Sequence, residues 1–118
     1  MTEDHLLRAV LKMARLFGLK AAHFRPALSQ SGRWHTAVQG DGKGFPDLVI
    51  VGRDVIFPEL KSEKGRYSPE QIAWKAALEA AGMRAPTWQP ADLESGRIER
   101  ELRALRGEIA SAKPAWMK

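Results

Sequence analysis

The sequence predicts a small α/β fold in which a mixed sheet of about four strands is flanked by helices. Three segments repeat apolar residues at helical spacing, and two apolar, strand-like runs joined by a short turn lie between the first two segments. The expected order is helix, strand, strand, strand, helix, strand, helix. Because 118 residues suffice for one modest core, we expect a single domain over residues 1–106 and a flexible tail over residues 107–118.

The first helix is expected to begin after Thr2, a good N-cap residue, with Glu3 in its first turn at the positive end of the helix dipole. Its apolar residues recur at helical spacing as far as Gly18, which ends the pattern. A short strand over residues 21–25 follows, and then a long polar loop over residues 26–43. A loop of this length in a compact domain is usually functional or disordered.

A β-hairpin is expected over residues 47–61, with its turn centred on Arg53. In this register the numbers of facing residues sum to 106, so that Asp47 and Glu59 become direct cross-strand neighbours. Their Cβ atoms would then lie roughly 4.5–5.5 Å apart. Pro58 has no N–H to donate to the ladder, and it can displace this register.

The face that carries Asp47 and Glu59 also carries Lys61, because side chains alternate along a strand. Two close carboxylates repel each other, and Lys61 supplies only one positive charge against two negative ones. A divalent cation such as Mg²⁺ or Mn²⁺ would balance the site. A structural ion pair with one carboxylate in solvent explains the spacing equally well. Both strand faces are otherwise apolar, and a sheet covered on both sides favours the functional interpretation.

The second helix has a clear start, because Ser68 and Gln71 form the pattern of a capping box around a proline at the first helical position. The helix is expected to run to about Ala81, with Trp74 and Leu78 packing into the core from one face.

A last strand is expected over residues 83–88, where Pro86 places it at an edge or a bulge. A final helix is expected over residues 92–105, with a break at Gly96. Arginine and glutamate alternate along this helix, which indicates a salt-bridged surface rather than a DNA-reading face.

Basic residues outnumber acidic ones by 19 to 14, and the net charge of +5 suits a polyanionic partner such as nucleic acid. Six of the basic residues lie in the long loop or near the acidic hairpin. Each is expected either to contact a phosphate or to remain a solvated surface charge: Arg25, Arg33, Lys43, Lys64, Arg66 and Lys75.

Several classes of site and location are not expected. The absence of cysteine excludes disulfides and thiolate metal sites, and the three histidines lack the spacing of metal ligands. No apolar run approaches the roughly 20 residues that cross a bilayer. The N-terminus begins with acidic residues and has no cleavage pattern. We therefore expect no membrane partner and a cytoplasmic location.

The residues of the acidic hairpin resemble a nuclease motif. Asp47 after a proline, followed by the triplet ELK that holds Glu59 and Lys61, is similar to the motif of the PD-(D/E)XK nuclease superfamily. The stretches GFPDLVIV and ELKSEKGRYSPEQIAWKAALEAAG, followed by WQPAD, resemble the small stand-alone form of the VRR-NUC (virus-type replication–repair nuclease) family. The resemblance covers residues 3 to about 105 and implies a small restriction-endonuclease-like core.

The resemblance also implies roles for individual residues. Asp47 and Glu59 would bind Mg²⁺ or Mn²⁺, and Lys61 would orient or deprotonate the attacking water. Glu3 would be a further acidic metal ligand from the first helix, and Gln71 a further catalytic residue. From the residues alone, Glu3 is more simply a first-turn acid and Gln71 a capping residue.

The function implied by the resemblance is that of a metal-dependent DNA endonuclease in a bacterial or phage-infected cell. Stand-alone members suggest a branched substrate, such as a four-way junction, cut by a symmetric homodimer. The alternatives are a monomeric nicking or flap-trimming nuclease, and a non-catalytic DNA-binding module with the same fold.

Overall fold

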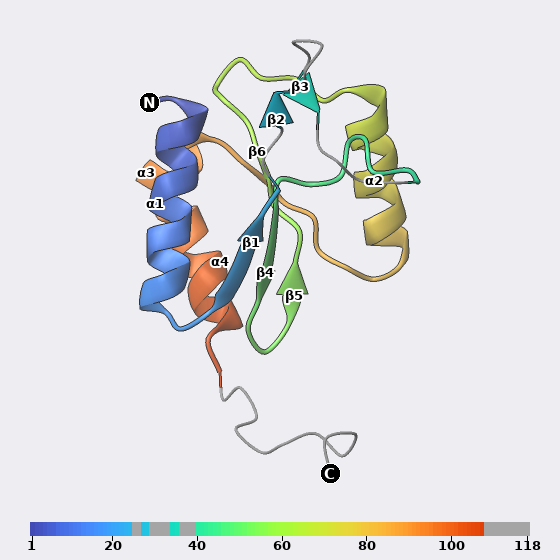
Figure 1. Ribbon diagram of the computed structural model, residues 1–118. Coiled ribbons are helices and arrows are strands. Elements are labelled where there is room, and N and C mark those ends of the chain that lie inside the picture. The colour runs from blue at the N-terminus through green and yellow to red at the C-terminus, as the bar shows by residue number, and fades with distance from the viewer. Residues whose placement is uncertain (25–26, 29–33, 36–39, 108–118) are drawn as a thin grey trace.

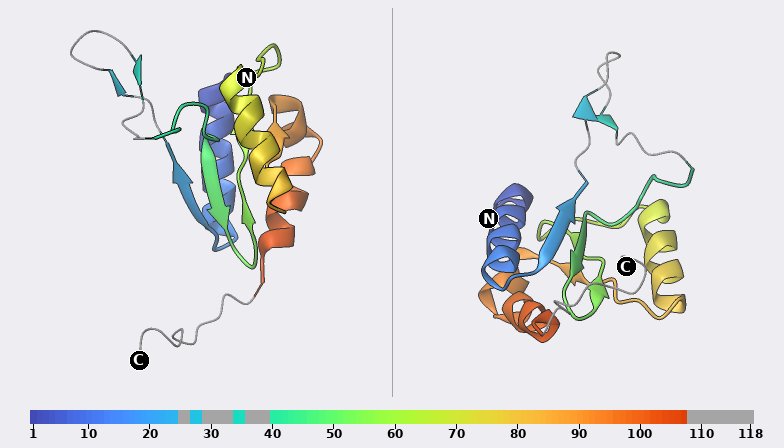
Figure 2. Two further views of the ribbon diagram at one scale, coloured as in Figure 1. Left: turned by 90° about the vertical axis from the view of Figure 1, so that its right-hand side faces the viewer. Right: turned by 60° about the horizontal axis from the view of Figure 1, so that its bottom comes forward.

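A short mixed sheet lies between α1 and α4 on one side and α2 on the other (Figures 1 and 2). The computed structural model describes residues 1–24, 27–28, 34–35 and 40–107. The elements in chain order are α1 (Glu3–Leu16), β1 (Lys20–His23), β2 (Ala27–Leu28), β3 (Trp34–His35), β4 (Leu48–Val51), β5 (Val55–Ile56), β6 (Glu59–Leu60), α2 (Pro69–Ala80), β7 (Thr87–Trp88), α3 (Pro90–Glu94) and α4 (Arg97–Leu105). The predicted small α/β fold is confirmed. None of the helices in these described ranges is both long and apolar enough to span a membrane.

The predicted register of the hairpin is confirmed where β4 and β5 pair, since Ile50 lies opposite Ile56 in an antiparallel ladder. The other edge of β4 pairs with β1, also antiparallel. Pro58 interrupts the ladder without shifting it: its carbonyl still accepts a hydrogen bond from the Leu48 N–H at 3.2 Å. Because Pro58 has no N–H to return, the second arm of the hairpin is divided into β5 and β6.

The opposite edge of this second arm pairs with the last strand in the parallel direction. Glu59 lies opposite Thr87 in the β6–β7 pair, and a separate bridge joins Ile56 to Arg84. The predicted strand over residues 83–88 is therefore only partly regular, because Pro86 lacks the N–H that would complete the ladder between these two points. The hydrogen-bonded order β1, β4, β5/β6, β7 gives the mixed sheet of four strands that the sequence predicts.

The core fills the space between the sheet and the helices α1, α3 and α4. The even-numbered residues of the hairpin strands are almost completely buried there, together with residues of the helices and β7: Leu6, Val10, Ala14, Leu48, Ile50, Ile56, Leu60, Trp88, Ile98, Leu102 and Leu105. This packing places the first turn of α1 beside the end of the hairpin, because α1 contacts both β1 and β6.

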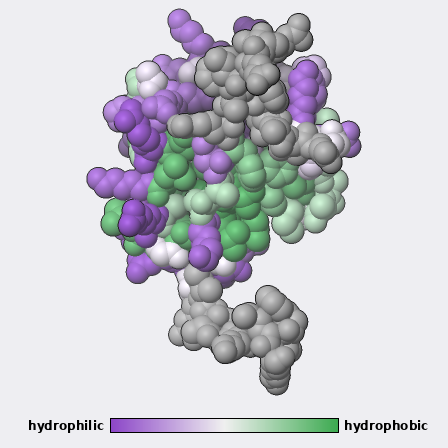
Figure 3. Space-filling model, viewed as in Figure 1, coloured by the Kyte–Doolittle hydropathy of each residue, from purple (hydrophilic) through white to green (hydrophobic). Residues whose placement is uncertain are grey.

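The sheet has helices on both sides, but its second face is covered less completely than the face that carries the core (Figure 1). On the second face Val51 is 37% exposed, and no residue of α2 is buried. Trp74 and Leu78 are half-buried rather than part of the core. The helix is attached mainly through residues next to the strands: the Trp74 ring contacts the Phe45 ring at a centroid distance of 4.9 Å, and its indole N–H donates to the Asp41 carbonyl. In Figure 3 hydrophobic side chains are visible across the middle of the viewed face.

Three further boundaries differ from the prediction. The loop predicted over residues 26–43 contains the short antiparallel pair β2–β3, and β1 ends at His23, two residues early. The final helix is two helices, separated at Gly96, whose φ of +83° suits glycine. The break is thus confirmed, although the first of the two helices begins earlier than predicted. The predicted flexibility of the tail falls on residues 108–118, which lie outside the described residues.

Candidate active site

Asp47 and Glu59 form a carboxyl pair at the end of the hairpin, close enough for Asp47 to affect the pKa of Glu59. Asp47 directly precedes β4, and its Oδ2 accepts a hydrogen bond from the Leu60 N–H at 2.8 Å. Glu59 begins β6 and is only 6% exposed. Burial, followed by the charge and hydrogen bond of Asp47, raises the pKa of Glu59 to about 8, while Lys61 acts in the opposite direction. This pair is therefore short of positive charge.

Lys61 and Gln71 extend the pair into a connected group of four residues, called the array below: Asp47, Glu59, Lys61 and Gln71. Lys61 Nζ donates to Gln71 Oε1 at 2.8 Å and lies 4.0 Å from Glu59 Oε1. Only 13% of its side chain is exposed, which is unusual for a lysine. The ammonium thus lies inside the protein beside the carboxyl pair, rather than in solvent.

Gln71 connects the array to α2. Its Nε2 donates to Glu59 Oε1 at 2.9 Å, and its Oε1 accepts hydrogen bonds from Lys61 Nζ and from the Ser68 N–H. The Gln71 N–H in turn donates to Ser68 Oγ, which completes the predicted capping box. The capping interpretation is therefore confirmed. The same side chain also contacts Glu59 and Lys61, and its catalytic role stays a prediction.

Glu3 lies near the array but is not joined to it. It stands in the exposed first turn of α1, and its pKa is raised by burial and then by the charge of Asp47, with Lys61 opposing. Its carboxyl is therefore within electrostatic reach of both residues. Across the described ranges, however, no three acidic or histidine side chains are grouped closely enough to hold a metal ion. The structure thus assembles the Asp47–Glu59 pair and leaves Glu3 outside it.

The segment from the start of β1 to Gln89 identifies the family of this chain. A model described as VRR-NUC domain matches residues 20–89 of this chain. The protein belongs to the VRR-NUC family. This membership implies a nuclease-like function in the processing of DNA. No curated protein and no solved structure matches.

The VRR-NUC match includes every residue of the array: Asp47, Glu59, Lys61 and Gln71. It begins at residue 20, after α1, so Glu3 is outside the matched segment. The match also ends before α3 and α4, whose side chains fill the core.

The basic residues predicted to contact nucleic acid fall into four groups. Lys64 and Arg66 are exposed in the connection between β6 and α2, next to the array in the chain. Lys43 is also exposed, but it pairs with Glu70 at 3.0 Å. Lys75 supports the fold, because its ammonium donates to the Ala85 carbonyl and pairs with Glu79. The other two, Arg25 and Arg33, lie outside the described residues.

Sequence reasoning missed the aromatic neighbour of the array. Lys61 Nζ lies 5.4 Å from the centre of the Tyr67 ring, and the Tyr67 hydroxyl is hydrogen-bonded to the Thr87 hydroxyl. No sequence pattern relates a single tyrosine in a polar turn to a lysine six residues earlier. Its contact becomes visible only when the turn closes over the hairpin.

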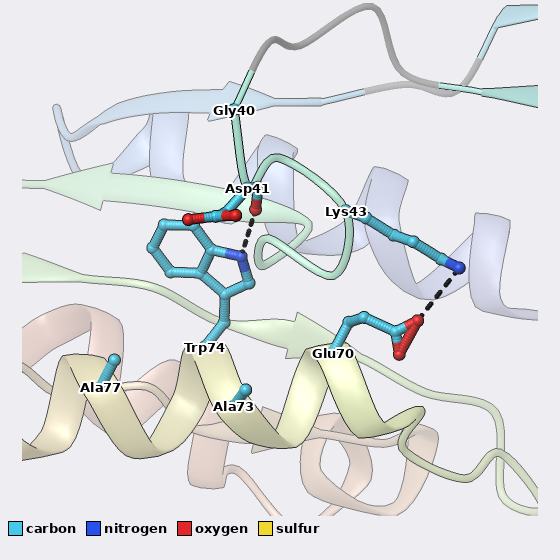
Figure 4. Close-up of a pocket in the computed structure, with 7 residues that line it drawn as sticks. All are labelled: Gly40, Asp41, Lys43, Glu70, Ala73, Trp74 and Ala77. Carbon is cyan, nitrogen blue, oxygen red and sulfur yellow. Dashed lines mark hydrogen bonds and ion pairs between the residues drawn. The ribbon is translucent and has the colours of Figure 1, made fainter.

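A separate pocket lies between the segment of residues 40–43 and the side of α2 (Figure 4). Its lining residues are Gly40, Asp41, Lys43, Glu70, Ala73, Trp74 and Ala77. None of these belongs to the array, and the two charged side chains labelled Lys43 and Glu70 point toward each other across its edge. The residues of the family motif therefore lie outside this pocket.

Proposed function

We propose that this VRR-NUC protein is a metal-dependent, structure-specific DNA endonuclease that hydrolyses phosphodiester bonds. The observation that carries the proposal is the connected array of Asp47, Glu59, Lys61 and Gln71 inside the matched segment. A buried carboxyl beside a second carboxyl, hydrogen-bonded to a glutamine and paired with a lysine ammonium 4.0 Å away, is costly as a purely structural feature. It is useful where charge must be neutralised and a water molecule activated.

The donor set of the pair fits Mg²⁺ or Mn²⁺. The two carboxyls offer oxygen ligands, and the raised pKa of Glu59 indicates a site that lacks a positive charge when no ion is present. Asp47 and Glu59 would hold the ion, and Glu3 is the nearest further acid by its electrostatic coupling. A bound divalent ion would polarise the phosphate and lower the pKa of a bound water.

The side chains of the protein supply the remaining chemistry. An ammonium has three N–H donors, and Gln71 occupies one of those on Lys61, which leaves donors for a water or a phosphate oxygen. Lys61 would orient the attacking water and stabilise the negative charge that develops on the phosphate. Gln71 would hold Lys61 and Glu59 at a fixed separation, since it bonds to both.

A branched DNA, such as a four-way junction, is the proposed substrate. Lys64 and Arg66 offer exposed charge for phosphates beside the array. One domain carries one array, whereas resolving a junction needs two cuts at related positions. A symmetric homodimer would supply the second site.

The proposal is tested by incubating the purified protein with linear, flapped and four-way DNA of matched sequence, each with Mg²⁺, Mn²⁺ or EDTA. Cleavage is expected with either metal, fastest on the four-way DNA, and none is expected in EDTA. Cleavage of flapped DNA alone would replace the junction with the flap-trimming alternative. Binding to all three DNAs without cleavage in any metal would contradict the enzymatic proposal and favour a DNA-binding module.

A further inference from the structure

Tyr67 lies where the connection between β6 and α2 turns back over Lys61. It is half-buried, and the centre of its ring is 5.4 Å from Lys61 Nζ. We infer that Tyr67 is a positioning residue that, anchored by Thr87, holds the Lys61 ammonium in the array. This inference rests on the proposed function only in giving Lys61 its catalytic role.

The ring provides a second point of attachment for the ammonium. A lysine ammonium stands on a flexible four-carbon stem, so that a single hydrogen bond leaves it free to rotate around its partner. Gln71 Oε1 holds Nζ from α2, and the Tyr67 ring meets it from the preceding connection. An ammonium within about 6 Å of a ring centre is attracted by the face of the ring, and the attraction increases when solvent is excluded. The two contacts from different elements thus define one position for Nζ.

The ring is itself fixed to the strand pair that carries Glu59. The Tyr67 hydroxyl is hydrogen-bonded to the hydroxyl of Thr87, and Thr87 lies opposite Glu59 in the parallel β6–β7 pair. The Thr87 carbonyl accepts a hydrogen bond from Arg97 Nη1 at 3.2 Å, which ties β7 to α4. The position of the Lys61 ammonium is therefore set relative to the Glu59 carboxyl through rigid elements.

Gly65 closes the turn onto the stem of Lys61. Its N–H donates to the Ser62 carbonyl at 3.0 Å, and a Cβ at this position would lie 3.1 Å from Lys61 Cδ and 3.2 Å from Lys61 Cβ. A residue without a side chain lets the turn lie directly on the lysine stem. This enclosure explains why only 13% of the Lys61 side chain is exposed, against 84% for Lys43.

An experiment that needs neither activity nor metal tests the inference. Metal-free protein is treated with a limiting amine-acetylating reagent, and the rate at each lysine is measured by mass spectrometry of its peptide. In the wild type Lys61 should react much more slowly than Lys43. Tyr67→Leu should raise the Lys61 rate at least about fivefold, because the ring no longer holds the ammonium. Tyr67→Phe keeps the ring but loses the hydrogen bond to Thr87, so its Lys61 rate should lie between those of the wild type and Tyr67→Leu.

Lys75 is the internal reference, because its ammonium is held by Ala85 and Glu79 and not by Tyr67. An unchanged Lys61 rate in Tyr67→Leu would overturn the inference. The same is true of an equal acceleration at Lys75, which would indicate general loosening, and of a Phe variant as reactive as the Leu variant.

Cleavage kinetics give the second readout. Tyr67→Leu should lower kcat roughly tenfold while KM stays within about twofold, because a displaced catalytic group affects the chemical step. In single-turnover measurements the same substitution should add no further loss to Lys61→Ala, since the two residues act as one unit. Independent, multiplying losses would contradict a role through Lys61. If the wild type cleaves no DNA, the proposed function fails, and the acetylation result still decides the placement of Lys61.

Discussion

Glu59 is a carboxyl residue that the fold buries beside a second carboxyl. The order of causes explains the direction of its pKa: burial removes water from the charged form, and Asp47 adds a like charge and a hydrogen bond. Lys61 offsets only part of this effect. The protonation of Glu59, and the stability of the fold around it, therefore depend on whether a positive charge lies beside the pair.

The first prediction concerns pH and stability without metal. The pKa of Glu59 rises from 4.5 to about 8 on folding, so its contribution favours the fold below pH 4.5 and is lost as the pH rises through about 8. The contribution of Glu59 to the free energy of unfolding should fall by at most about 1.4 kcal/mol per pH unit between pH 4.5 and about 8. Glu3 acts in the same direction, whereas the lowered pKa of Glu70 acts only at more acidic pH.

Thermal melts in EDTA from pH 5 to pH 8.5 measure this dependence. The melting temperature of the wild type should decline across the range, and Glu59→Gln should flatten most of the decline. A decline of equal slope in both proteins would assign the pH dependence to other groups.

The second prediction concerns metal and stability. An ion that binds the folded pair and not the unfolded chain stabilises the fold by about 2.7 kcal/mol at 100 times its Kd. Mn²⁺ should therefore raise the melting temperature of the wild type and of Lys61→Ala, which keeps both carboxyls. It should not raise that of Asp47→Asn. Equal shifts in the wild type and in Asp47→Asn would show that the ion binds elsewhere.

The N-terminus of α2 connects the fold to the site. The segment before β4 crosses this helix at Gly44, whose φ is +83° and whose missing Cβ would lie 2.5 Å from the carbonyl carbon of Glu70. It would also lie 2.8 Å from the Gln71 nitrogen. Close backbone contact at Gly44 thus helps to hold Gln71 where it reaches both Glu59 and Lys61.

The third prediction compares two glycines of nearly equal φ. Gly82→Ala, at +84° with open space around the new methyl group, should cost about 1–2 kcal/mol for the left-handed backbone alone. Gly44→Ala should cost about 1–3 kcal/mol more, because the methyl group also collides with α2. Denaturant unfolding measures both values. If the two variants lose the same stability, the contact between Gly44 and α2 is not tight in solution.

Local signals predicted these elements better than their packing. The capping box of Ser68 and Gln71 depends on only four consecutive residues, and the hairpin register follows from the position of its turn. The burial of α2 was not predictable in the same way, since its apolar face is half-covered by residues 40–45 rather than by strands. The neighbours Tyr67 and Thr87 are also brought together by parallel pairing of distant segments, which no local pattern encodes.

The two faces of the sheet are covered unequally. One face carries the core, and the other leaves Val51 more than a third exposed, while Ile72 and Met83 are also exposed. Exposed apolar residues occur on monomers, but apolar area is enriched in homodimer interfaces. Exposed residues of this kind are compatible with the proposed dimer, which would bring two arrays to one branched substrate.

The fourth prediction is that the active species is a dimer. Light scattering at micromolar concentration, with and without four-way DNA, should give twice the mass of the 118-residue chain for the protein component. A monomer that cuts the two strands of a junction independently would contradict the dimer and favour the nicking enzyme.

The proposed metal-dependent nuclease site depends on the buried carboxyl of Glu59. The most direct test is the single-turnover cleavage rate of Glu59→Gln in Mg²⁺, with Glu63→Gln as the matched control. Both substitutions replace a carboxyl with an amide in the β6–α2 region, but Glu63 is exposed and lies four residues along the chain. Glu59→Gln should lose at least about 100-fold in rate, whereas Glu63→Gln should stay within about twofold of the wild type. A Glu59→Gln protein that cleaves at the wild-type rate would contradict the proposed role of Glu59 in the nuclease site.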